Sequence, residues 1–126
     1  METEPPFLLD GARVAYYAIL GEAAMRRGFS FVAGGVTISP ASVSRIVVTE
    51  NLLDKNVFLL HCNEHWETVA AAPVPDVEGA KAAAADAYEG IHIPWTTFRS
   101  LTDAERSEMQ TTTEFLRELA AGMLDE

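Results

Sequence analysis

The sequence has one cysteine, Cys62, and therefore cannot form an intramolecular disulfide. It has no apolar run approaching the roughly 20 residues that a membrane-spanning helix needs. Its first six residues are acidic and proline-containing, without the positive start and apolar core of a secretion signal. These absences predict a soluble cytoplasmic protein that does not associate with a membrane.

Basic residues are also scarce. The 126 residues include 9 Lys or Arg against 19 Asp or Glu, and the net charge is −10. Residues 1–63 carry a net charge of −1, whereas residues 64–126 carry −9. An acidic surface repels phosphate backbones, which argues against nucleic-acid binding, and it attracts a basic partner. The competing interpretation is that the carboxylates only keep a small protein in solution.

Three segments in the middle of the chain have the character of β-strands. They cover residues 43–49, 57–62 and 66–71, with short connections between them. Strands joined this closely form an antiparallel meander, and the apolar run at 57–60 suits its central strand. Residues 13–20 also favour a strand because adjacent tyrosines stand beside alternating apolar positions. A helical stripe runs through the same region as far as Met25, so both assignments stay open.

Two helices are predicted after these strands. Asp76 is a good N-cap for a helix over residues 76–88, and Gly90 suits the left-handed position after its end. Thr102 and Glu105 form a capping-box pattern that opens the last helix. The apolar stripe that we expect this helix to bury consists of Met109, Thr112, Phe115, Leu116, Leu119 and Met123.

The predicted fold class is therefore α+β, an antiparallel meander with helices packed on one face. A chain of this length is the size of one domain and can bury a core without disulfides or metal. We expect a single domain over residues 1–126, with the first nine residues flexible.

Residues 61–65 match H-x-x-E-H, the inverted zinc-peptidase motif. That chemistry needs both histidines on one helical face, where a spacing of four residues brings the two rings to one metal. Here His61 ends an apolar strand, and extended geometry would separate its ring from that of His65 by more than about 10 Å. Cys62 is a weak nucleophile candidate, because adjacent strand residues point to opposite faces and His61 cannot activate it. With no phosphate-binding glycine loop either, we predict no catalytic residue, metal or cofactor.

A longer series of short motifs links these segments. The apolar residues 57–60 are followed by His-Cys-Asn-Glu-His-Trp-Glu at 61–67, Val-Glu-Gly-Ala-Lys at 77–81 and Ala-Tyr-Glu-Gly-Ile at 87–91, while 16–21 supply an earlier strand. This layout, over residues 14–95, resembles small bacterial immunity proteins of polymorphic-toxin and contact-dependent inhibition systems. Asn63 stands where that pattern has aspartate. Immunity proteins act by binding, so the resemblance implies a binding protein and supplies no catalytic residues.

The function predicted from the sequence is a non-enzymatic, immunity-type protein that occludes a basic toxin domain. The predicted partner-binding residues, with Trp66 as an apolar anchor unless it lies in the core, are Glu64, Trp66, Glu67, Asp76, Glu78, Glu89, Glu105 and Glu108. Two alternatives stay open. One is a small enzyme or ligand-binding domain with a pocket between sheet and helices, and the other is a housekeeping homo-oligomer.

Overall fold

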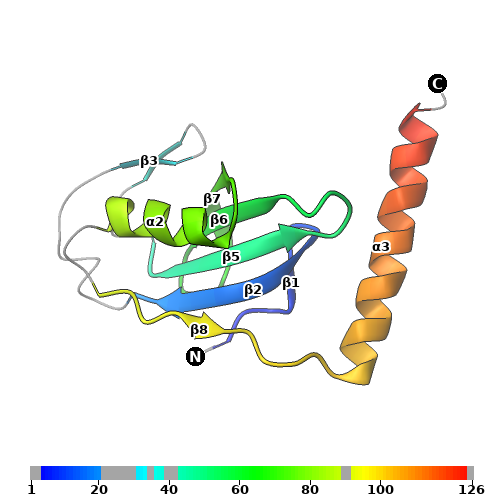
Figure 1. Cartoon of the computed structure of the whole chain (residues 1–126), viewed down its shortest axis with the longest axis horizontal. Coiled ribbons are helices and arrows are strands. Elements are labelled where there is room, and N and C mark those ends of the chain that lie inside the picture. Colours follow the sequence, from blue (N-terminus) through cyan, green and yellow to red (C-terminus); the bar gives the residue numbers. More distant parts are fainter. Residues whose placement is uncertain (1–3, 21–30, 34–35, 39–42, 89–91, 125–126) are drawn as a thin grey trace.

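The computed structural model describes residues 4–20, 31–33, 36–38, 43–88 and 92–124. They form an antiparallel sheet in the order β1-β2-β5-β6-β7, with β8 also paired to β2, and a separate β3–β4 hairpin (Figure 1). The elements in chain order are β1 (Leu8–Leu9), β2 (Ala12–Ile19), β3 (Phe31–Ala33), β4 (Val36–Ile38), β5 (Arg45–Asn51), β6 (Val57–Cys62), β7 (Thr68–Val74), α2 (Val77–Ala87), β8 (Thr96–Thr97) and α3 (Asp103–Leu124).

The predicted fold class, α+β with an antiparallel meander, is confirmed. Strands β5, β6 and β7 follow one another in the chain and pair in that order, with Ile46 opposite His61 and His61 opposite Ala70. The segment from residue 13 to 20 is also a strand, since β2 covers most of it. The rest of that ambiguous region, from residue 21, lies outside the described residues, as do Gly34, Gly35 and Gly90.

Helix α2 covers one face of the sheet. Asp76 caps it as predicted, because its Oδ1 accepts a hydrogen bond of 2.7 Å from the Gly79 N–H. Ala80 and Ala84 are completely buried, and their small side chains let the helix lie close to the strands. Against them pack buried residues from the sheet and its flanks, namely Ala18, Leu20, Val43, Ile46, Val48, Leu59 and Ala70, with Tyr88 at the end of the helix.

The opposite face of the sheet is buried as well. A second cluster there consists of Val14, Val47, Leu60, Cys62, Trp66 and Phe98. A strand that is buried on both faces is apolar along most of its length, which explains the apolar run at 57–60. The sheet curls on this side, and the hydroxyl of Thr68 in β7 donates a hydrogen bond of 2.8 Å to Oδ2 of Asp10 in the β1–β2 turn. Segments from distant parts of the sheet therefore meet on this face.

Helix α3 begins at the predicted capping box. The Glu105 N–H donates to Thr102 Oγ1 at 3.1 Å, and the Thr102 N–H donates to Glu105 Oε1 at 2.9 Å. The helix stands beside the end of the sheet (Figure 1), where Leu116 lies against Gly11 of the β1–β2 turn. Within the described residues, no helix is both long and apolar enough to span a membrane.

The prediction that α3 buries its whole apolar stripe is wrong for two residues. Phe115 is 58% exposed and Leu119 is 49% exposed, whereas Met109, Thr112 and Leu116 are partly buried. Because α3 touches the end of the sheet and not its broad face, only one side of the helix is covered. The side chain of Met123 lies outside the described part of the chain.

Candidate functional site

His61 does not sit where the zinc-peptidase motif needs it. It lies on β6, facing α2, and is only 2% exposed. Its Nδ1 is 2.6 Å from the Tyr88 hydroxyl, and burial lowers the pKa of His61 to about 4. His65 lies in the exposed β6–β7 turn, with its Nε2 3.5 Å from Glu64 Oε1. Among the described residues, no three His, Cys, Asp or Glu side chains are grouped to hold a metal ion.

Cys62 is a buried thiol on the opposite face of β6. It is fully buried in the second cluster, and burial raises its pKa to about 12. A nucleophilic cysteine needs the thiolate at neutral pH, which this environment disfavours. Its neighbour His61 faces α2 from the other side of the sheet, as strand alternation requires. Neither residue therefore has the surroundings of a catalytic group.

Trp66 belongs to the core and is not a surface anchor, which corrects its assignment to the partner-binding set. It is 2% exposed and meets Tyr17 edge-on at 5.7 Å between ring centroids. The guanidinium of Arg45 lies 5.1 Å from the centroid of the indole ring. Trp66 has φ +62 at the end of a tight turn, where its N–H donates to the Asn63 carbonyl at 3.1 Å.

The predicted acidic residues do not form one surface. Glu64 and Glu67 occupy the β6–β7 turn, whereas Asp76 and Glu78 begin α2 beyond the far end of β7. A strand of seven residues separates the two pairs by about 20 Å. Glu89 lies outside the described residues.

Several of these carboxylates also have structural partners. Glu67 accepts a hydrogen bond of 2.9 Å from the Asn63 side-chain amide, and Asp76 is occupied as the N-cap of α2. Glu105 accepts two bonds, of 2.7 and 2.8 Å, from the Arg99 guanidinium, and these bonds lower its pKa to about 2. Of the predicted set, Glu108 stands on the exposed side of α3.

Glu108 belongs to a surface that we call the outer face of α3. Phe115 and Leu119 are four residues apart and therefore adjacent on the helix, and both are exposed. Glu118 follows Phe115 by three residues, and Glu108 precedes Phe115 by seven residues, or two helical turns, so both carboxylates lie on the same side of the helix as Phe115. The outer face consists of Glu108, Phe115, Glu118 and Leu119. The sequence indicates the amphipathic stripe of α3, but Phe115 and Leu119, which it predicts to be buried, are exposed.

Several basic residues lie between α3 and the end of the sheet. Two hollows of about 300 and 170 Å³ separate it from the end of the sheet, and Arg13 lines both. Arg106 lines the larger hollow, and Lys55 and Arg117 line the smaller one. The apolar Met109 lines both hollows, and Glu50, whose carboxylate lies 3.9 Å from Lys55, lines the smaller one as well.

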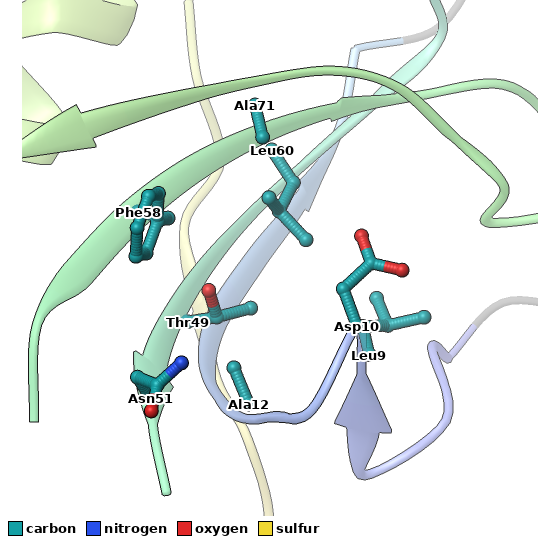
Figure 2. A pocket seen from close by; sticks show the side chains of 8 residues that line it. All are labelled: Leu9, Asp10, Ala12, Thr49, Asn51, Phe58, Leu60 and Ala71. Atoms are coloured by element: carbon teal, nitrogen blue, oxygen red, sulfur yellow. The ribbon is translucent and has the colours of Figure 1, made fainter. Parts of the chain in front are cut away.

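A pocket of about 160 Å³ lies on the face of the sheet turned away from α2. The ligand-binding alternative expected a pocket between sheet and helices, where the two hollows beside α3 lie, whereas this pocket lies on the other face of the sheet from α2. Figure 2 shows side chains from the sheet and from the β1–β2 turn facing one another across it. Its lining residues are Leu9, Asp10, Ala12, Thr49, Asn51, Phe58, Leu60 and Ala71.

Comparison of the chain with protein-family models, with curated proteins and with solved structures finds no match.

Proposed function

We propose that this chain is a non-enzymatic binding protein that neutralises a basic toxin domain by covering it, in the manner of the immunity proteins its motif order resembles. The observation that carries the proposal is the outer face of α3. There, two large apolar side chains are exposed on a rigid helix between carboxylates. Such an apolar centre with a charged rim is the usual composition of a protein-binding surface.

Three further features support binding over catalysis. The buried His61 is held by Tyr88, and the Cys62 thiol is buried with a raised pKa. His61 and Cys62, two of the residues that suggested chemistry, therefore serve the core. The net charge of −10 favours encounter with a basic partner, because opposite charges steer diffusing proteins together.

The first test removes the apolar pair. We expect the double variant Phe115→Ser, Leu119→Ser to lose binding by roughly 100-fold or more, because exposed aromatic and aliphatic anchors dominate interface energy. Its free energy of unfolding should stay within about 1 kcal/mol of the wild type, since neither side chain is buried in the free protein. The measurement starts with capture of partners from the native host on wild-type bait. Each partner is then purified, and its toxicity on expression is compared with and without the chain.

A matched control is Ile19→Ser, which removes another exposed apolar side chain, on β2. This variant should keep full binding and full neutralisation. A captured partner that binds the double variant as well as the wild type would place the interface elsewhere. A partner that is bound but not neutralised would leave a binding protein without an immunity role, contrary to the proposal.

The second test uses charge and salt. Reversing Glu108 and Glu118 to lysine should slow association by roughly threefold to tenfold, because rim charges act on the encounter step. Raising the salt concentration should slow association of the wild type and leave dissociation nearly unchanged. Association and dissociation rates from surface plasmon resonance at low and high salt provide the measurement.

The control for charge reverses Glu64 and Glu67 instead. These residues lie in the β6–β7 turn, at the other end of β6 from the β5–β6 turn that adjoins α3. The change in net charge is the same, so a specific interface on α3 predicts the smaller effect here. Equal slowing by both pairs would show general attraction alone, and a larger effect at Glu64 and Glu67 would move the interface to the turn.

A further inference from the structure

The pocket in Figure 2 combines an apolar interior with one charged group at its rim. Leu9, Phe58 and Leu60 are the large apolar residues that line it, and Thr49 and Asn51 contribute polar groups. Asp10 is the only charged residue among the described residues that line it. A ligand that matches this arrangement has an apolar body and one positive end.

We propose that this pocket binds an alkyl cation, an alkylammonium or alkylguanidinium group with a chain of about four carbons. A cavity of about 150 Å³ in a protein core accommodates a molecule the size of benzene, so a pocket of about 160 Å³ has room for such a chain. The chain would lie along the apolar lining, and the charged end would meet the Asp10 carboxylate at the exposed rim. Long basic side chains behave in the same way, because their carbon chain contacts apolar surface while their charged end stays in water.

The position of Asp10 is fixed by the backbone and by one hydrogen bond. Asp10 and Gly11 have φ +52 and +75, and they form the two-residue turn between β1 and β2. The Thr68 hydroxyl holds Asp10 Oδ2. A carboxylate has about four acceptor positions, so Asp10 can bond a ligand while keeping Thr68. Preorganisation of this kind lowers the entropic cost of binding.

Two sources could supply the cation. One is a free small amine, and the other is a lysine or arginine side chain of the basic partner. The second source rests on the proposed function, whereas the first does not. The shared chemistry is the alkyl cation, and the experiment separates the sources.

The test is a titration of the full chain with n-butylguanidinium, followed by amide chemical shifts in NMR spectra. The control ligand is n-butylurea, which has the same shape without the charge. We expect n-butylguanidinium to shift the amides of the lining residues with a dissociation constant on the order of 1 mM, as suits so small a ligand. It should bind at least about fivefold more tightly than n-butylurea.

The matched variants are Asp10→Asn and Asp86→Asn. Asparagine can still accept the Thr68 hydroxyl, and it suits a left-handed position before glycine, so the first variant keeps the turn. It should lose the preference for the cation. Asp86 is exposed on α2, on the other side of the sheet, and its replacement should change nothing.

Each outcome decides the proposal. The absence of shifts at the lining residues, at about ten times the expected dissociation constant, would overturn it. Equal affinity for n-butylguanidinium and n-butylurea would overturn the role of Asp10. If Asp10→Asn also weakens capture of a purified partner, the cation is a side chain of that partner. If the probe binds and capture is unchanged or no partner exists, the cation is a free amine, and the pocket stands without the proposed function.

Discussion

Replacing Trp66 by alanine is expected to lower the free energy of unfolding by about 3–5 kcal/mol. The indole ring is almost completely buried, and it contacts Tyr17 and Arg45. Removing a buried tryptophan forfeits its transfer energy and leaves a cavity that the surrounding strands can only partly fill. Urea unfolding followed by circular dichroism measures the change, with the slope of the transition as a check on two-state behaviour.

Two further variants show which part of the loss comes from the ring. Trp66 has a positive φ, which costs every residue except glycine roughly 1 kcal/mol. Trp66→Gly should therefore be milder than Trp66→Ala by up to about 1 kcal/mol, although glycine is elsewhere the more damaging replacement. Trp95→Ala, at a partly buried tryptophan, should cost clearly less than Trp66→Ala. A loss of less than about 1 kcal/mol for Trp66→Ala would contradict the core assignment.

The second large effect concerns acid. Lowering the pH from 7 to 4 should reduce the free energy of unfolding by about 3 kcal/mol through His61 alone. Burial lowers the pKa of this group from 6.5 to about 4 in the folded chain. Between these two values the unfolded chain binds the proton and the folded chain does not, so stability falls as the pH falls. The contribution is fully present above pH 6.5 and is lost progressively toward pH 4.

The control is the double variant His61→Leu, Tyr88→Phe. It removes both partners of the buried hydrogen bond together, so that neither is left buried without the other. Its stability should depend less steeply on pH between 6.5 and 4.5. Glu105 has a lowered pKa of about 2 and therefore acts on stability below this interval. Identical pH dependence in the wild type and the double variant would show that His61 is protonated freely in the folded chain.

The parts of the fold that sequence predicted well are those encoded by neighbouring residues. Asp76 and the Thr102–Glu105 pair act on backbone groups within one helical turn, so their spacing alone identifies both helix starts. Alternation and short connections identify the meander. The Asp10-Gly11 turn also has a local signal, because Asp-Gly between apolar residues is typical of a two-residue hairpin.

The candidate sites could not be predicted, because they depend on contacts between distant segments. The periodicity of α3 shows that it is amphipathic, but it does not show that Phe115 would find no covering element. A strand such as β6, apolar on both sides, does not reveal which face α2 covers, and its sequence therefore does not indicate the pocket on the opposite face. Carboxylates that are close in sequence, such as Glu67 and Asp76, separate because β7 runs between them.

The pairing of β2 has a consequence for behaviour at high concentration. Its outer edge is shared by β1, opposite Ala12 and Arg13, and by β8, opposite Tyr16 and Tyr17. At the other border of the sheet, Pro73 lies within β7 and has no N–H to offer. An unprotected strand edge recruits identical chains and seeds aggregates. Deleting residues 4–9 would uncover the edge of β2 at Ala12 and Arg13, and we therefore expect it to increase concentration-dependent association, which light scattering measures.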